Sequence, residues 1–176
     1  MKTKLRILIL LLSCACLSAC VVRGDSRAMV PAGFSPGRQF KKTVNIVVAG
    51  GQAPSMSGVS LVSNENLVSA VETAIGQSGL FSQVVHSGTG DYQLDVRLIQ
   101  LHLPMMGFNM TGQAEIEWRL RQPATGRVIW QKITNNPYTA TAGQAFAGAK
   151  RVRLAAEGTV RENIKAALGQ IAALPL

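Results

Sequence analysis

Hydrophobic and polar residues alternate with a period of two over most of residues 92–121, the most regular stretch of the chain. The alternation begins with four hydrophobic residues, Tyr92, Leu94, Val96 and Leu98. Its phase then shifts by one, because the next hydrophobic positions are Ile99, Leu101 and Leu103. A shift of one residue in a period of two is what a β-bulge accommodates, so we expect a bulge near Leu98 and Ile99.

After a segment bounded by proline and glycine, the alternation continues without interruption over residues 108–121. One side of this predicted strand is apolar and includes Trp118, whereas the other side is polar and charged. Such a pattern is typical of an antiparallel sheet that has one face packed and one face in water. Residues 122–126 predict a turn, and residues 128–130 predict the next strand of a meander.

Apolar residues recur at helical spacing in two other stretches. Residues 64–78 predict a helix that is capped by Ser63 or Asn64 and stopped by Gly79. Residues 144–174 predict a longer helix with Phe146 on its apolar side and Glu157 on its charged side. Gly158 weakens this second helix and is a candidate for a bend.

Shorter strands are predicted at residues 44–49 and 83–86, where β-branched residues are concentrated. The predicted order of elements is therefore strand, helix, three or four strands, helix. Two helices need an apolar surface to cover, and a sheet with one apolar face supplies it. The predicted fold is α+β, with an antiparallel four- to five-stranded sheet and both helices packed on one face.

The first 19 residues have the features of an export signal. Lys2, Lys4 and Arg6 precede a short apolar run, and small residues follow it. The sequence Leu17-Ser18-Ala19-Cys20 resembles the bacterial lipobox, which implies cleavage between Ala19 and Cys20. The alternative is an ordinary signal peptide that happens to contain cysteine.

The lipobox resemblance also implies a membrane anchor. Cys20 would carry a thioether-linked diacylglycerol and an N-acyl chain such as palmitate, and several acyl chains together hold a protein firmly on a membrane. Val21, rather than Asp, follows the cysteine, as in lipobox proteins of the outer membrane. We therefore expect the protein on the periplasmic face of the outer membrane of a Gram-negative cell.

Removal of residues 1–19 changes the composition of the chain. The full sequence of 176 residues has 18 basic and 9 acidic residues, and three of the basic ones leave with the signal, so the net charge falls from +9 to +6. Cys14 and Cys16 also leave, and Cys20 is modified, so no disulfide is expected. Residues 20–42 are rich in Gly and Pro and predict an acylated cysteine with a flexible tether. Residues 43–176 predict a single periplasmic domain.

The residues capable of catalysis form no recognisable set. His86 and His102 have no Cys, Asp or Glu at metal-ligand spacing, and no Gly-x-Ser-x-Gly motif occurs. Glu115 and Glu117 share one strand face with two arginines, which is typical of a solvated surface. We therefore expect no enzymatic activity, no metal and no cofactor besides the lipid on Cys20.

A predicted hairpin tip is one candidate for contact with a partner. Met105, Met106 and Phe108 crowd a turn that Pro104 and Gly107 bound. Exposed apolar residues of this kind invite a protein partner or a membrane, and methionine suits adaptable surfaces. The alternative is that the tip folds under the sheet and belongs to the core.

A basic cluster is the other candidate surface. Lys150, Arg151 and Arg153 lie near the start of the last predicted helix, where they could meet anionic lipid or an acidic partner. A solvated helix face is the alternative. The remaining cations are scattered and the protein is exported, so nucleic acid is not an expected partner.

Several features resemble a loose group of small Gram-negative envelope lipoproteins. They are the lipobox, a helix ending at Ser78-Gly79-Leu80-Phe81, the hairpin Thr125-Gly126-Arg127-Val128-Ile129-Trp130 and the long final helix. The group includes lipoproteins of lipopolysaccharide transport, auxiliary lipoproteins of lipid-transport ABC systems and activators of peptidoglycan synthases.

The resemblance implies a non-enzymatic adaptor or scaffold in envelope assembly or transport, with an envelope protein as its partner. One alternative is a carrier for a lipid or a small apolar ligand, which needs an apolar cavity of roughly 300 Å³ or more. A second alternative is an enzyme acting on the cell wall, which needs polar groups gathered in a cleft.

Overall fold

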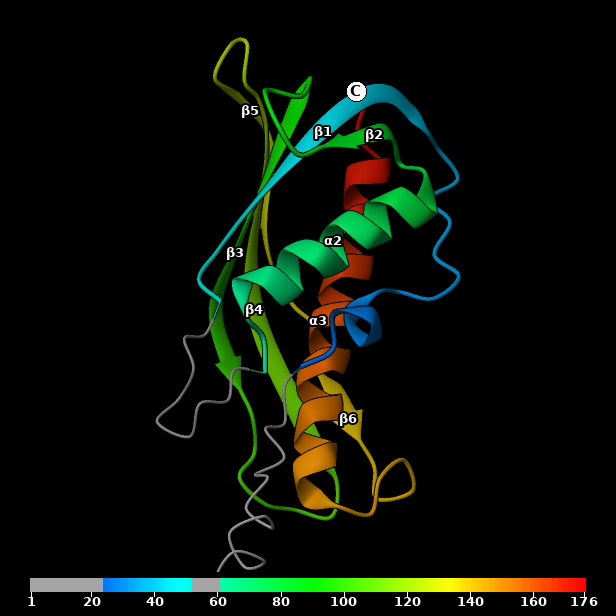
Figure 1. The fold of residues 1–176 in the computed structure, drawn as a ribbon, viewed down its shortest axis with the longest axis vertical. Coiled ribbons are helices and arrows are strands. Elements are labelled where there is room, and N and C mark those ends of the chain that lie inside the picture. Colours follow the sequence, from blue (N-terminus) through cyan, green and yellow to red (C-terminus); the bar gives the residue numbers. More distant parts are fainter. Residues whose placement is uncertain (1–23, 52–60) are drawn as a thin grey trace, which may run out of the picture.

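The computed structural model describes residues 24–51 and 61–176. Figure 1 shows the fold, in which two helices lie against a long twisted sheet. In chain order the elements are the 3₁₀ helix η1 (Ser26–Met29), β1 (Phe40–Ala49), α2 (Asn64–Ser78), β2 (Phe81–Val85), β3 (Tyr92–His102), β4 (Met110–Gln122), β5 (Arg127–Asn135), β6 (Tyr138–Ala140) and α3 (Gly148–Ala172).

The sheet has the strand order β2-β1-β3-β4-β5, and β6 pairs with the Met110 end of β4. The α+β class and the order of elements are confirmed, but the six-stranded sheet is mixed rather than antiparallel throughout. β1 runs parallel to both β2 and β3, whereas the pairs β3–β4 and β4–β5 are antiparallel. Alternation reports which face of a strand is wet and not the direction of its neighbour. Here α2 crosses over between β1 and β2, so the two strands run the same way.

The predicted bulge is present in β3. The pairing of β3 with β4 shifts register between Leu98 and Gln100. Ile99 is the residue left over, and it is 43% exposed, so its expected place on the apolar side is wrong. Leu101 and Leu103 beyond the bulge do pack against the core. The two sides of β4 are as predicted, because Ala114, Ile116, Trp118 and Leu120 are all fully buried.

The caps of α2 follow the sequence prediction. The Ser63 side chain accepts a hydrogen bond from the backbone N–H of Asn66 at 3.2 Å. Gly79 ends the helix with a φ of 63°, a left-handed conformation that glycine adopts without strain. Leu80 and Phe81 then return to the core, as expected.

The start of α3 differs from the prediction. The helix begins at Gly148, not at residue 144, and Phe146 lies before it with 98% of its surface exposed. Thr141 and Gln144 form a turn of their own, in which the backbone N–H of Thr141 donates to the Gln144 side chain at 2.9 Å. The helix starts after this turn, four residues later than predicted.

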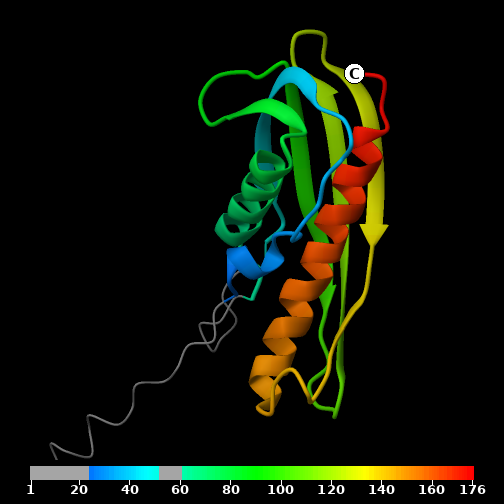
Figure 2. The same ribbon diagram turned by 90° about the vertical axis from the view of Figure 1, so that its right-hand side faces the viewer.

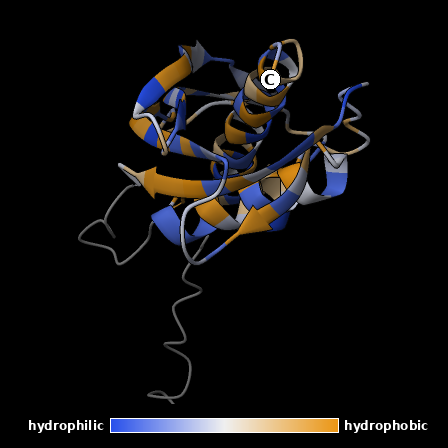
Figure 3. Cartoon of the chain, turned by 90° about the horizontal axis from the view of Figure 1, so that it is seen from above, coloured by the Kyte–Doolittle hydropathy of each residue, from blue (hydrophilic) through white to orange (hydrophobic). Residues whose placement is uncertain are grey.

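Both helices cover the same face of the sheet, as predicted (Figure 2). Hydrophobic and hydrophilic residues form alternating bands along the helices and strands when the molecule is seen from above (Figure 3). α3 approaches the strands closely at Gly158, where an added Cβ would lie 2.1 Å from a ring carbon of Tyr138. Gly158 therefore admits the Tyr138 ring of β6 against the helix.

Two buried polar residues of α3 close a gap in the sheet where β4 changes partner from β5 to β6. The Thr159 hydroxyl accepts a hydrogen bond from the Ala114 backbone N–H at 3.1 Å and donates to the Asn136 carbonyl at 2.6 Å. The Asn163 amide donates to the Ala114 carbonyl at 3.2 Å. These side chains replace the strand-to-strand hydrogen bonds that Ala114 lacks.

The described part of the expected tether is packed on the domain instead of extending from it. Met29 in η1 is fully buried, and the Arg161 guanidinium of α3 donates to the Ala28 carbonyl at 3.1 Å. β1 also begins at Phe40, before the predicted boundary. Residues 26–29 therefore do not form the flexible tether that the Gly- and Pro-rich composition predicted, because η1 contacts both α2 and α3.

Candidate functional site

One end of the molecule carries four large hydrophobic side chains in water. In the connection from β3 to β4, the exposed fractions are 95% for Met105, 84% for Met106 and 80% for Phe108. Phe146, in the segment before α3, is 98% exposed. Both segments lie at the same end of the molecule in the two views of the fold (Figures 1 and 2). We call these four residues the apolar end.

The exposure of the three residues from the hairpin tip excludes the interpretation that the tip belongs to the core. They do not fold under the sheet, where Met110 at the start of β4 is the nearest buried methionine along the chain. Phe146 was missed as a surface residue because helical spacing placed it on a buried face. Its exposure depends on where α3 begins, because Phe146 lies two residues before the first helical residue, Gly148.

Arg151 joins the two segments of the apolar end. Its guanidinium donates to the Gly107 carbonyl at 3.1 Å, and it donates to the carbonyls of Ala145 and Phe146 at 2.9 and 2.6 Å. A planar guanidinium with several donors suits such a junction. Arg151 therefore holds the β3–β4 connection against the segment that precedes α3.

The predicted basic cluster does lie beside the apolar end, because its three residues are in the first two turns of α3. Their environments differ, however. Lys150 is exposed, Arg151 turns toward the loop carbonyls, and Arg153 lies 3.5 Å from the carboxylate of Glu157. Lys150 is thus the member most open to an external anion.

Glu157 was expected on the solvated side of the helix, but it is 1% exposed. Its carboxylate accepts a hydrogen bond from the backbone N–H of Asp25 at 2.8 Å. Burial raises the pKa of Glu157, and the Asp25 N–H and Arg153 oppose this rise. The residue fastens the start of the described chain to the middle of α3, a contact between residues 132 positions apart.

The residues considered for catalysis stay apart in the structure. His86 is on the surface, 3.1 Å from the Glu72 carboxylate, and His102 is exposed near the end of β3. Glu117 accepts hydrogen bonds from Arg119 at 3.2 Å and Gln131 at 2.6 Å, in the mixed-charge surface that was expected. In residues 24–51 and 61–176, no group of three or more His, Cys, Asp and Glu residues could hold a metal ion.

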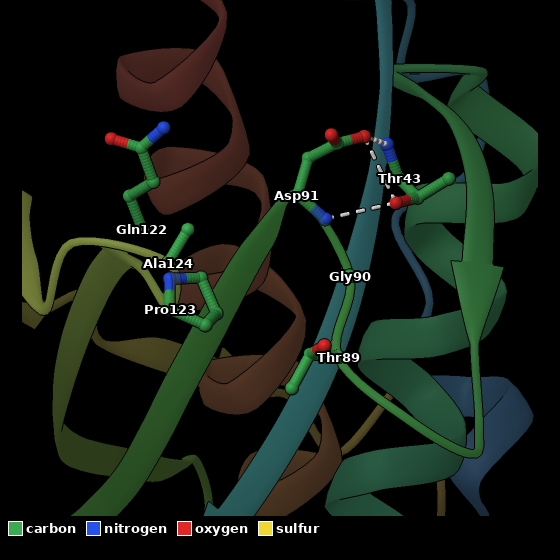
Figure 4. A pocket seen from close by; sticks show the side chains of 7 residues that line it. All are labelled: Thr43, Thr89, Gly90, Asp91, Gln122, Pro123 and Ala124. Carbon is green, nitrogen blue, oxygen red and sulfur yellow. Dashed lines mark hydrogen bonds between the residues drawn. The ribbon is translucent and has the colours of Figure 1, made fainter.

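A hollow of about 370 Å³ lies at the opposite end of the sheet (Figure 4). Asp91 and Thr43 line one side, and the residues around Pro123 line the other. Hydrogen bonds from the backbone N–H and then the hydroxyl of Thr43 lower the pKa of Asp91. No lining residue comes from α2 or α3, so this hollow is not the cavity between sheet and helices that a carrier needs.

The anchoring residues predicted from the sequence, Ala19 and Cys20, lie outside the described residues. Within the described part of the chain, no helix combines the length and hydrophobicity needed to cross a membrane.

No family model matches the chain, and no curated protein matches its sequence. Solved structures do match its fold. Protein XCC0632 from Xanthomonas campestris, of the family DUF330, superposes with a TM-score of 0.61 and 15% identity over 81% of this chain and 89% of its own. The hypothetical protein CT253 from Chlamydia trachomatis gives 0.52 and 9% identity over 77% and 98%.

A minor lipoprotein from Acinetobacter baumannii gives a lower TM-score of 0.48 at 9% identity, over 77% of this chain and 94% of its own. At these identities the comparisons concern the fold alone. XCC0632 and CT253 thus share the α+β fold of this chain.

Proposed function

We propose that the protein is a lipoprotein anchored to the periplasmic face of the outer membrane, where it serves as a non-enzymatic adaptor in envelope assembly or transport. The sequence Leu17-Ser18-Ala19-Cys20 supports the anchor. The apolar end supports the adaptor role, because it offers a surface for contact. An envelope protein is the proposed partner of the adaptor.

The observation that carries the proposal is the exposure of 80% or more at all four residues of the apolar end. Single exposed hydrophobic residues are common, but two segments distant in sequence converge here and are held by one arginine. An enzyme needs polar groups gathered in a cleft, and a carrier needs an enclosed apolar cavity. The residues of the apolar end provide neither, whereas they suit docking to another surface.

Photo-crosslinking in intact cells tests the contact role. A photoreactive residue is placed at position 106 or 146, and at Gln170 as a control on the exposed side of α3. We expect adducts from positions 106 and 146 and only background from position 170. Mass spectrometry of the adducts then identifies lipid or protein. An absence of adducts at both positions would contradict the contact role.

The adaptor role further predicts that an envelope protein is recovered by chemical crosslinking of the whole lipidated chain. The double variant M105S/M106S should lower this recovery while leaving the free energy of unfolding within about 0.5 kcal/mol of the wild type, since both side chains are exposed. The variant V128S/I133S removes half-exposed hydrophobic surface from β5 and is the matched control. Equal recovery from both double variants would contradict the proposal.

Anchoring is tested separately. Cys20→Ala should leave an uncleaved or soluble protein, because the thioether carries the acyl chains. Metabolic labelling with palmitate checks the modification directly, and a wild-type protein without label would refute the lipoprotein assignment.

A further inference from the structure

We infer that the apolar end docks into the surface of the same membrane leaflet that holds the Cys20 lipid. The inference rests on the lipid anchor of the proposed function. It assigns the four residues of the apolar end to the membrane surface, so protein adducts from the same residues are the competing outcome of its test. Four observations support this inference. They are the reach of the chain from Cys20, the exposure of the hydrophobic side chains, the basic residues near them in sequence and the hydrogen bonding of the backbone at the apolar end.

The reach of the chain allows anchor and apolar end to lie in one plane. The Asp25 backbone is hydrogen-bonded to Glu157, which is nine residues beyond the first residue of α3. Nine helical residues place Asp25 about 14 Å along the helix from its start. Asp25 is five residues after Cys20, and five steps of extended chain can span at most about 16–18 Å. The anchored cysteine can therefore reach the level of the apolar end.

The side chains of this end suit the boundary between lipid headgroups and acyl chains. Two methionines and two phenylalanines are each at least 80% exposed. Such side chains can enter the acyl region while a neighbouring lysine reaches to the headgroups. Lys150, the exposed member of the basic cluster, lies next to them at the start of α3.

The two stretches of sequence that contain the apolar end carry basic residues and no acidic ones. No Asp or Glu occurs between Asp95 and Glu115 or between Glu117 and Glu157, and these two stretches contain both segments of the apolar end. Lys150, Arg151 and Arg153 occur in the second stretch close to Phe146. A basic surface of this kind attracts anionic lipid headgroups, and these stretches contain no carboxylate that would repel the lipid phosphates.

Several backbone carbonyls at the apolar end have hydrogen-bond partners within the protein and do not depend on water. The carbonyls of Gly107, Ala145 and Phe146 all accept hydrogen bonds from Arg151. Moving a carbonyl from water into an apolar environment costs less free energy when the carbonyl already accepts a hydrogen bond from the protein. The arginine thus supports insertion of both loop segments without unsatisfied acceptors at these positions.

A fluorescent probe on single cysteines tests the inference on the lipidated full chain. Met106→Cys and Phe146→Cys are labelled with nitrobenzoxadiazole, and Gln170→Cys is the control. The protein is reconstituted into vesicles of phosphatidylethanolamine and phosphatidylglycerol that contain brominated acyl chains. Intact mass first checks that the purified protein carries its acyl chains.

We expect probes at positions 106 and 146 to emit at shorter wavelength and to be quenched by the bromines, whereas the probe at position 170 stays unquenched. Lys150→Glu should reduce the quenching in these anionic vesicles more than in phosphatidylcholine vesicles. Equal quenching at all three positions would overturn docking by this end.

The two proposals fail in distinguishable ways. Unquenched probes, together with protein adducts from positions 106 and 146 in cells, would overturn membrane docking and leave the contact role intact. Absence of the acyl chains from the purified wild type would overturn both the anchor and this inference.

Discussion

The β4–β5 turn and the β3–β4 connection lie at opposite ends of β4, and their backbones are held in different ways (Figure 1). In the β4–β5 turn, the Gly126 N–H donates to the Gln122 carbonyl at 2.9 Å, and the Thr125 hydroxyl donates to the Gln122 side chain at 3.2 Å. In the β3–β4 connection, the Gly107 carbonyl depends on Arg151, 44 residues away.

This difference separates a turn that only reverses the chain from one that presents a surface. The first uses polar residues and a glycine at φ 70°, so its structure follows from local chemistry. The second leaves Met105, Met106 and Phe108 without a role in the described interior. Local stability does not require hydrophobic residues there, which favours an external use for them.

The largest expected effect on stability comes from a substitution in β4, the strand that joins the β4–β5 turn to the β3–β4 connection. Trp118 is fully buried in β4, and its indole N–H donates to the Thr134 hydroxyl at 2.8 Å. Trp118→Asp should lower the free energy of unfolding by more than about 4 kcal/mol, because it removes the ring and buries a charge. Thermal unfolding measures this. Glu117→Gln, one residue away on the wet side, should cost less than about 1 kcal/mol, and similar losses in both variants would contradict the assigned faces.

A smaller loss is expected from Gly158→Ala. The added Cβ would clash with the Tyr138 ring, so β6 should be displaced from α3 near the apolar end. We expect the free energy of unfolding to fall by about 1–3 kcal/mol, as it does at other overpacked sites. Gly169→Ala in the same helix is the control, since nothing lies within 4 Å of its added Cβ. A stabilised Gly158→Ala variant would show that helix propensity outweighs the close contact.

Arg151→Met tests the comparison directly, because it keeps the hydrophobic stem and removes the donors. The free energy of global unfolding should fall by about 1 kcal/mol. Hydrogen exchange should accelerate in the β3–β4 connection and before α3, but not in the β4–β5 turn. Acceleration in both turns, or in neither, would contradict a specific role for this arginine.

The smallest expected effect depends on pH. The pKa of Glu157 is raised in the folded protein, so the folded state binds this proton more readily than the unfolded state. As pH falls from neutral toward the ordinary value of 4.5, the wild type should gain stability relative to Glu157→Gln, which cannot titrate. Melting temperatures of both proteins across this range measure the trend. Glu162→Gln, on the surface of the same helix, controls for loss of one negative charge, and a relative loss in the wild type would contradict dominance by burial.

Local patterns in the sequence predicted the elements whose residues contact mainly their own neighbours. The alternation over β4, the bulge after Leu98 and the Ser63 and Gly79 ends of α2 all follow from short-range periodicity and capping. The α+β class and the shared face for both helices also followed, because an apolar sheet face and apolar helix faces must cover one another. The prominence of Met105, Met106 and Phe108 was visible for the same reason, as hydrophobic residues in a tight turn.

Contacts between distant residues decided the rest. The alternation of hydrophobic and polar residues gives no information on the direction of a neighbouring strand. The parallel pairing of β1 with β2 and β3 was therefore not predictable from it. The packing of residues 24–30 on α3, the burial of Glu157 and the exposure of Phe146 each depend on partners far along the chain or on where a helix starts. The sequence by itself thus determined most of the elements, the two faces of β4 and the candidate tip. Only the tertiary structure joined that tip to Phe146 through Arg151, because a hydrogen bond across 44 residues leaves no periodic signal.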